Sequence, residues 1–193
     1  RQEQAFSTPD KIVATDWIKG NASSTVTIIE YSDFQCPACA LYYPVLEKLF
    51  NESSSTIRFV YRHFPLPQHQ HALHASQASE AAGNQGKFWE MYSMIFSTQD
   101  EWKDLADAVP TFTTYAEKLG LDMNKYLADF DSKEVKEKID NNLQGGVKAG
   151  INSTPTFYIN GKKIQNPNGY DEFRKIIDEA LGKTINENIP SPI

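Results

Sequence analysis

The chain has 193 residues, of which 40% are hydrophobic and 12% aromatic, enough to fill the core of a folded domain. Its formal net charge of −6 argues against nucleic-acid binding, which selects for basic surfaces. The sequence contains no run of about 18 apolar residues, so we expect no membrane span within it.

The first third of the chain alternates between strand and helix patterns. Residues 25–31, TVTIIEY, are β-branched and aromatic, which predicts a strand buried on both faces. Residues 37–50 have apolar side chains at helical spacing, and residues 56–64, TIRFVYRHF, alternate as a strand does. Two strands joined by a helix through short links form a βαβ unit, whose strands are parallel.

Strand patterns stop between about residues 67 and 150, where Ala, Glu, Gln and Met are abundant. This composition predicts an all-helical block, in which Gly120 ends one helix and Asp122 caps the next. The predicted helices of its second half lie near 101–108, 111–119, 122–131 and 133–148.

Strand patterns return after this block. TPTFYING at 154–161 and KKIQ at 162–165 predict a hairpin around an Asn-Gly turn. YDEFRKIIDEAL at 170–181 then predicts a closing amphipathic helix. The expected fold is α/β, a βαβ unit followed by an inserted helical block and a ββα unit, with a four-stranded mixed sheet.

This order of elements predicts a discontinuous domain. Residues 16–66 and 150–182 are expected to form the α/β domain, and residues 67–149 the inserted helical domain. The polar ends, residues 1–15 and 183–193, are expected to be flexible.

Both cysteines lie in SDFQCPACALYYP, residues 32–44, with two residues between them. Pro37 suits the first position of a helix, because its missing N–H would have no partner there. Cys36 is therefore expected at a helix N-terminus, where backbone N–H groups and the helix dipole stabilise a thiolate. Cys39 follows one turn later and faces the protein more. This asymmetry is typical of a redox pair with an exposed attacking thiol and a shielded resolving thiol.

The motif CPAC at a strand-to-helix junction, with STPTF at 153–157 opening a later strand, resembles a thioredoxin-fold oxidoreductase. The long helical insertion makes the chain similar to the DsbA-like family, including its Gram-positive members called BdbD. The segments DFQCPAC, RHFPLP, EAAGNQGKFWEMY and GINSTPTFYINGK resemble that family's segments in the same order. The resemblance covers residues 16–181.

The resemblance implies a role for each matching residue. Cys36 matches the family's nucleophile and Cys39 its resolving cysteine. Pro155 matches the cis-proline that faces the active-site sulfurs, and the backbone of Thr154 would pair with an extended substrate segment. Glu30 matches a buried acid whose raised pKa would let it relay a proton to or from Cys39.

The residues between the cysteines, Pro37 and Ala38, are expected to lie against the bound substrate. Ala38 stands where the strongly oxidising proteobacterial members have histidine, so one stabiliser of the Cys36 thiolate is absent. Gln35 stands where thioredoxin itself has tryptophan, which weakens an interpretation as a cytosolic reductant.

The resemblance implies an extracytoplasmic thiol:disulfide oxidoreductase, a dithiol oxidase that introduces disulfides into secreted or envelope proteins. Expected partners are reduced or unfolded proteins and a quinone-linked membrane protein of the DsbB or VKOR type, which would reoxidise the pair. We expect a monomer that needs no cofactor or metal. The expected location is the periplasm or the outer face of the cytoplasmic membrane, with a signal peptide or a membrane anchor before Arg1 as open alternatives.

Other functions stay open. The same cysteine pair would also serve a reductase or an isomerase. In a different class, the chain would be a metal-binding or holdase-like module with an idle pair. A static disulfide is the weaker alternative, because so short a loop removes little entropy from the unfolded chain.

Two further stretches are candidates for metal binding. The four histidines fall within His63–His74, but their spacing matches no zinc pattern, and a mobile, solvated edge between loop and helix is expected instead. The acidic stretch at 100–107 is expected to be a solvated face, with a weak calcium site as the alternative.

Overall fold

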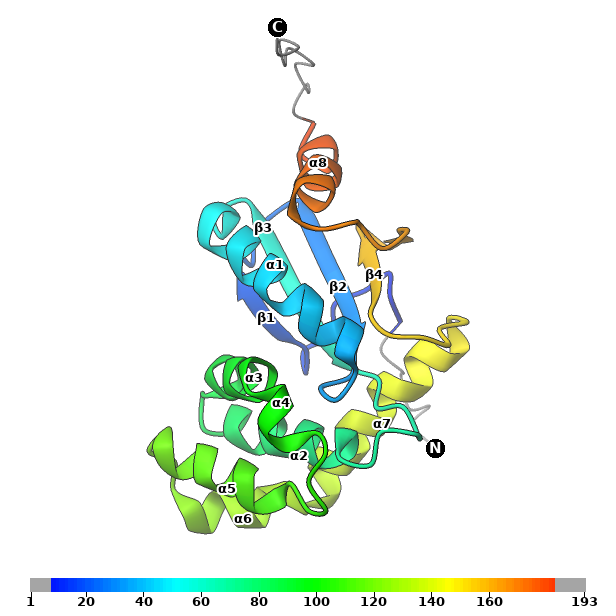
Figure 1. The fold of residues 1–193 in the computed structure, drawn as a ribbon. Helices are drawn as coiled ribbons and strands as arrows, with labels where there is room; N and C mark the ends of the chain where they lie inside the picture. Colours follow the sequence, from blue (N-terminus) through cyan, green and yellow to red (C-terminus); the bar gives the residue numbers. More distant parts are fainter. Residues whose placement is uncertain (1–7, 183–193) are drawn as a thin grey trace, which may run out of the picture.

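The computed structural model describes residues 8–182 and places five strands and eight helices there (Figure 1). In chain order they are β1 (Trp17–Gly20), β2 (Val26–Ser32), α1 (Pro37–Ser53), β3 (Ile57–His63), α2 (Ala72–Gly83), α3 (Phe88–Ser97), α4 (Gln99–Trp102), α5 (Val109–Lys118), α6 (Met123–Phe130), α7 (Lys133–Lys148), β4 (Thr156–Ile159), β5 (Lys162–Lys163) and α8 (Tyr170–Ala180). Of the ends predicted to be flexible, 1–15 and 183–193, residues 1–7 and 183–193 lie outside the described residues.

The strand β2 lies at the centre of one mixed sheet, whose order is β1-β3-β2-β4-β5. It pairs in parallel with β3, from Val26 opposite Ile57 to Ser32 opposite His63. It pairs antiparallel with β4 on its other side. Every residue of β2 is buried, so the predicted βαβ unit and its doubly buried strand are confirmed.

The prediction of four strands is wrong, because β1 adds a fifth at the edge of β3. This four-residue strand has no strong pattern of its own and is held by contacts with the helical block. The ring of Trp17 stacks on Phe88 with 5.0 Å between centroids, and its Nε1 donates to Glu80 Oε1 at 2.8 Å. Gly83 makes room for the same ring, since a Cβ there would come within 2.3 Å of it. Contacts so distant in sequence leave no local signal.

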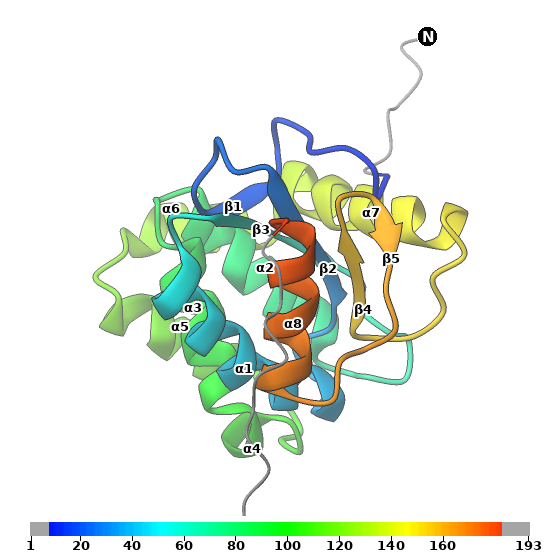
Figure 2. The same cartoon turned by 90° about the horizontal axis from the view of Figure 1, so that it is seen from above.

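Helices cover both faces of the sheet. Figure 2 shows α1 and α8 on one face and α7 on the other. The first face forms a large apolar cluster that continues into the helical block, from Ile28 and Leu46 to Phe88 and Phe112. The second face forms a smaller cluster that includes Ile29, against which α7 places Leu143. The sheet and the inserted helices therefore share one continuous core.

The helices α5, α6 and α7 confirm three of the predicted stretches. Asp122 caps α6 by accepting a hydrogen bond from the Lys125 backbone, and Gly120 adopts a positive φ of 70° after α5, as a helix stop requires. The predicted helix at 101–108 is wrong, since α4 ends at Trp102. There the Asp107 side chain accepts from the Val109 backbone, which favours a turn over a continued helix.

Within residues 8–182, none of the helices combines the length and the hydropathy that a bilayer crossing requires.

Candidate active site

Cys36 is the N-cap residue of α1, directly after the loop that leaves β2. Its backbone is extended, with φ −69° and ψ 122°, and Pro37 occupies the first turn. The unpaired N–H groups of that turn therefore lie beside the Cys36 side chain, as the sequence predicts. Both cysteines are in the free thiol form. The prediction of an exposed Cys36 is wrong, because the residue is 7% exposed against 1% for Cys39.

The pKa values of the two thiols are shifted in opposite directions from the ordinary value of a cysteine. A hydrogen bond from the Cys39 thiol lowers the pKa of Cys36 to about 5 from an ordinary value of 9.0, and this outweighs the opposing effect of burial. Hydrogen bonds from the Thr154 side chain and from the backbone N–H groups of Cys39 and Ala38 also contribute to this lowered pKa of about 5. Burial raises the pKa of Cys39 well above the same ordinary value, and its hydrogen bond to Cys36 adds to the rise. At neutral pH the pair therefore holds one thiolate, at Cys36, and one thiol, at Cys39.

The loop before β4 brings the second part of the site to the cysteines. The peptide bond between Thr154 and Pro155 is cis, as the resemblance implies. Cys36 Sγ lies 3.5 Å from the carbonyl oxygen of Thr154. The Thr154 hydroxyl is buried and makes no other hydrogen bond among the described residues, so it is available to the Cys36 thiolate.

Pro37 and Ala38 are exposed beside the buried cysteines. They form the exposed surface next to Cys36 and Cys39. The substrate-binding role that the resemblance implies for them stays a prediction.

Glu30 lies on β2, on the same face of the sheet as Cys39, and is 1% exposed. Burial raises its pKa to about 8 from an ordinary 4.5, while the Ser32 side chain acts in the opposite direction and the Cys36 charge adds to the rise. Glu30 is therefore mostly protonated at neutral pH. A carboxyl with a pKa close to the working pH is suited to general acid and base catalysis.

A buried aspartate holds the loop between β2 and α1. Asp33 is 1% exposed, and its carboxylate accepts from the backbone of Gln35 at 2.7 Å and of Leu66 at 2.8 Å. His69 Nδ1 lies 2.7 Å from the same carboxylate. The Asp33 carbonyl accepts from the Cys36 backbone at 3.1 Å. These bonds fix the position of Cys36 from the side of the β3–α2 loop.

The helical block fixes the same loop from the other side. Gln99 on α4 donates through Nε2 to the carbonyl oxygens of Phe34 at 2.7 Å and of Cys36 at 3.1 Å. Gln35 bridges the loop to the block as well, because it donates to the Lys103 carbonyl and accepts from the His71 backbone. The insertion therefore supports the cysteine pair directly.

The predicted solvated edge of histidines is wrong for His63 and His71, while His69 and His74 are partly exposed. His63 is 1% exposed, and its Nε2 lies 2.8 Å from Glu80 Oε1, while His71 is 3% exposed. These side chains belong to buried hydrogen-bond networks, which a spacing argument does not reveal. The acidic residues of 100–107 are exposed, as predicted. Within residues 8–182 no group of three or more His, Cys, Asp or Glu side chains has the arrangement of a metal site.

A family model described as Thioredoxin matches residues 13–179 of this chain.

The chain belongs to the thioredoxin family.

Curated relatives of this thioredoxin-family chain are longer proteins. It is 32% identical over 176 residues to the Na(+)/H(+) antiporter NhaA of Herminiimonas arsenicoxydans, and the match covers 91% of this chain and 27% of that protein. It is 35% identical over 170 residues to the Na(+)/H(+) antiporter NhaA 1 of Salinispora arenicola, covering 88% and 25%. The chain thus spans about a quarter of the length of these relatives.

Solved structures show the same fold at lower identity. The alpha-DsbA1 structure of Wolbachia pipientis gives a TM-score of 0.79 at 22% identity, covering 89% of this chain and 93% of that one. BdbD of Bacillus subtilis, in its oxidised form, gives a TM-score of 0.75 at 21% identity, covering 86% of this chain and 92% of that one. The catalytic domain of ScsC from Proteus mirabilis gives 0.75 at 19%, covering 91% and 94%. The predicted thioredoxin fold with a DsbA-like helical insertion is confirmed.

Sequence analysis missed several residues of the site in this family member. Asp33, three positions before Cys36, is a polar residue in an aromatic stretch, and that contrast was the available signal. Ser32, whose side chain lowers the pKa of Glu30, ends the strand run like its neighbours, so nothing marks it. Gln99 lies 63 residues from Cys36, and only the fold brings the two together.

Proposed function

We propose that this chain is a thiol:disulfide oxidoreductase that acts as a dithiol oxidase through Cys36 and Cys39. The observation that carries the proposal is the opposite direction of the two pKa values at a helix N-terminus, with Cys36 at about 5 and Cys39 well above 9.0. A stabilised thiolate at Cys36 is a good leaving group, so the reduced form is favoured and the oxidised pair readily gives up its disulfide.

The proposed reaction has two exchange steps. A substrate thiolate attacks Cys36 in the oxidised pair. The bond between Cys36 and Cys39 breaks, and Cys39 leaves as a thiolate that takes the proton of Glu30. The second substrate thiolate then attacks the substrate sulfur of the mixed disulfide, and Cys36 leaves as a thiolate. The substrate gains a disulfide and loses two electrons, which the cysteine pair has received.

Residues around the pair would position the substrate. The carbonyl group of Thr154 lies beside Cys36, where the backbone of an extended substrate segment can pair with residue 154. Pro155 fixes the direction of that loop, and Pro37 with Ala38 forms the open wall opposite. The backbone pairing is independent of side chains, which suits an enzyme that accepts many reduced or unfolded proteins.

The cellular setting of the proposal follows from the chemistry. A dithiol oxidase acts where disulfides persist, so we place the chain outside the cytoplasm, in the periplasm or at the outer face of the membrane. The substrates would be secreted or envelope proteins. Because each cycle leaves the pair reduced, an external oxidant must accept two electrons, and a quinone-linked membrane protein of the DsbB or VKOR type has the required chemistry.

Two single variants test the proposal on a reduced, unfolded substrate that contains two cysteines. Cys36→Ser is expected to abolish disulfide formation, because no sulfur remains at the reactive position. Cys39→Ser, oxidised as a mixed disulfide with a small thiol, is expected to exchange that thiol at Cys36 but to form no enzyme disulfide. Full activity of Cys36→Ser would overturn the proposal.

A further inference from the structure

Three buried polar atoms around Glu30 make no hydrogen bond of good length and angle among the described residues. They are Glu30 Oε2, the Ser32 hydroxyl and the Tyr61 hydroxyl. Buried polar atoms in folded proteins are nearly always hydrogen-bonded, so three in one region that are not call for a physical explanation. None of the steps in the proposed reaction uses Ser32 or Tyr61.

The strand register places all three on one face of the sheet. Glu30 and Ser32 are two positions apart on β2, so their side chains leave the same face. Tyr61 is paired directly with Glu30 across the parallel strands β2 and β3. Tyr61 and Cys39 belong to the same buried cluster on the α1 face. The three polar atoms therefore lie between the sheet and the helix that carries the resolving thiol.

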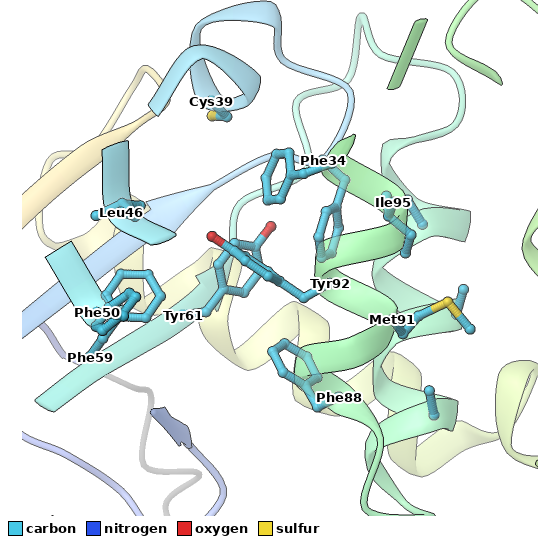
Figure 3. Packing of buried hydrophobic residues seen from close by; sticks show 14 of the residues in the cluster. Phe34, Cys39, Leu46, Phe50, Phe59, Tyr61, Phe88, Met91, Tyr92 and Ile95 are labelled. Atoms are coloured by element: carbon cyan, nitrogen blue, oxygen red, sulfur yellow. The ribbon is translucent and has the colours of Figure 1, made fainter. Parts of the chain in front are cut away.

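The packing around the Tyr61 ring directs its hydroxyl toward this region. Its ring packs against Tyr92 at 5.2 Å and Phe34 at 5.0 Å between centroids. Figure 3 shows the hydroxyl oxygens of Tyr61 and Tyr92 directed to the side on which Cys39 and Phe34 lie. Both rings are fixed by packing, so the Tyr61 hydroxyl has a defined direction.

Titratable groups face Glu30 from three elements that pack around it. They are Cys36 and Cys39 on α1, Tyr61 on β3 and Tyr92 on α3. Among the described residues, the groups that shift the pKa of Glu30 include no basic side chain. The ionised form of Glu30 therefore depends on hydroxyl donors, since no cation balances its charge.

We propose that Tyr61 and Ser32 are positioning residues for the proton that Glu30 exchanges with Cys39, and that they act through one water held between Glu30 Oε2 and their two hydroxyls. A buried water makes about two to four hydrogen bonds, and this site offers Glu30 Oε2, the two hydroxyls and the Cys39 thiol as partners. The hydroxyls orient the water, and the water donates to Glu30 when that carboxyl is ionised. The inference rests on the proposed function, because it assigns the proton path of that same cysteine pair.

The proton balance of the step is simple. When Cys39 resolves a mixed disulfide at Cys36, its S–H proton passes through the water to the Glu30 carboxylate. Cys39 Sγ then bonds to Cys36 Sγ, and the bond from Cys36 to the small thiol breaks. That thiol leaves as a thiolate. When the oxidised pair instead oxidises a substrate, Cys39 is the leaving thiolate, and the proton returns from Glu30 to the Cys39 sulfur.

The test follows the reduced protein with glutathione disulfide over a range of pH. The first phase is attack by Cys36, and the second is release of glutathione as Cys39 closes the disulfide. In wild type the second phase is expected to rise with pH around the pKa of Glu30, about 8. In Tyr61→Phe we expect the midpoint to move up by about one pH value and the second phase to slow about tenfold at neutral pH. The reason is that the water which donates to the carboxylate loses one of its partners.

The matched control is Tyr126→Phe, which removes the hydroxyl of another fully buried tyrosine, on α6. It is expected to leave both phases unchanged. Ser32→Ala is an independent variant with the same expected midpoint shift as Tyr61→Phe. Infrared titration of the Glu30 carboxyl gives the same midpoint without any exchange reaction.

The outcomes separate this inference from the proposed function. An upward shift of the Glu30 midpoint in both Tyr61→Phe and Ser32→Ala supports the water-mediated path. An unchanged Glu30 midpoint in these folded variants overturns it, while a fast first phase would still support Cys36 as the nucleophile. Absence of the first phase in wild type would overturn the proposed function itself, whatever the Glu30 midpoint.

Discussion

The sulfur of Cys36 lies 3.5 Å from the carbonyl oxygen of Thr154, a residue 118 positions later in the chain. The sheet explains this contact. Cys36 follows the C-terminal end of β2, and Thr154 precedes the N-terminal end of the antiparallel strand β4, whose Thr156 pairs with Tyr31. Both residues therefore emerge at the same edge of the sheet, and the strand register sets the position of the Thr154 backbone against the thiol.

Replacing Thr154 by valine tests the role of its hydroxyl. Thr154 is among the groups that lower the pKa of Cys36, and its hydroxyl has no other partner among the described residues. In Thr154→Val we expect the pKa of Cys36 to rise from about 5 to about 6, since a hydrogen bond to a charged group contributes about 1.5 kcal/mol or more. Ultraviolet absorbance of the thiolate during a pH titration measures the change.

The control for this variant is Thr113→Val on α5, whose hydroxyl donates to the Val109 carbonyl within the helical block. It should leave the Cys36 titration as in wild type. A Thr154→Val protein that titrates like this control would contradict the assigned contact.

Glu30→Gln tests the cost of burying a carboxyl. The pKa of Glu30 in the folded protein, about 8, lies above its ordinary 4.5, so ionisation is disfavoured in the folded state. The stability associated with the neutral form is present below pH 4.5 and is lost as the pH rises toward 8. Relative to Glu30→Gln, wild type should lose about 3 kcal/mol of unfolding free energy between pH 4.5 and 7.

Urea unfolding of the reduced proteins at several pH values measures this difference. Glu117→Gln, at an exposed position of α5, is the matched control and should show no such trend. If the gap between wild type and Glu30→Gln were the same at every pH, the raised pKa of Glu30 would be ruled out.

Asp33 and His69 should differ in their effect on stability. The buried Asp33 carboxylate accepts from two backbone N–H groups and also contacts His69. Asp33→Ala leaves these buried donors unpaired, so we expect it to cost about 3 kcal/mol or more of unfolding free energy. His69→Ala removes one contact of a side chain that is 19% exposed, and should cost about 1 kcal/mol. Equal losses in urea unfolding would show that the loop does not depend on the aspartate.

The sequence was sufficient for the parts of the fold that have local signals. The β-branched run of β2, the alternation in β3 and the Asn160-Gly161 turn each predict their element directly, and the order of elements then determines a βαβ unit. The motif CPAC after β2 places Cys36 at a helix N-terminus by the same local logic. These features depend on residues within a few positions of one another.

The features that sequence analysis missed depend on distant contacts. β1 forms because Trp17 packs into the helical block, and Gln99 reaches the Cys36 carbonyl from α4. The low exposure of Cys36 has the same origin, because the loop of Thr154 covers it. His63 and His71 look like surface residues by composition but are buried when the helical block packs on β3 and the loop that follows.

Gln99→Leu tests whether the helical block supports the cysteine loop. The variant loses two hydrogen bonds, to the carbonyls of Phe34 and Cys36, which should cost about 2 kcal/mol. Hydrogen exchange should become faster in the segment around Cys36, whose N–H bonds to Asp33. Gln144→Leu, at an exposed hydrogen bond of α7, is the control. Unchanged exchange in Gln99→Leu would mean that the loop is held from the sheet side alone.

The reduction potential of the Cys36–Cys39 pair is the most direct test of the proposed oxidase. Equilibration with glutathione buffers at several pH values, with free thiols counted, measures it. A Cys36 thiolate with a pKa of about 5 stabilises the reduced form, so we expect a potential near that of DsbA, about −120 mV. Near neutrality the potential should fall by about 30 mV for each pH unit, because reduction binds one proton for every two electrons. A potential near that of thioredoxin, about −270 mV, with a slope of about 60 mV, would contradict both the stabilised thiolate and the oxidising direction.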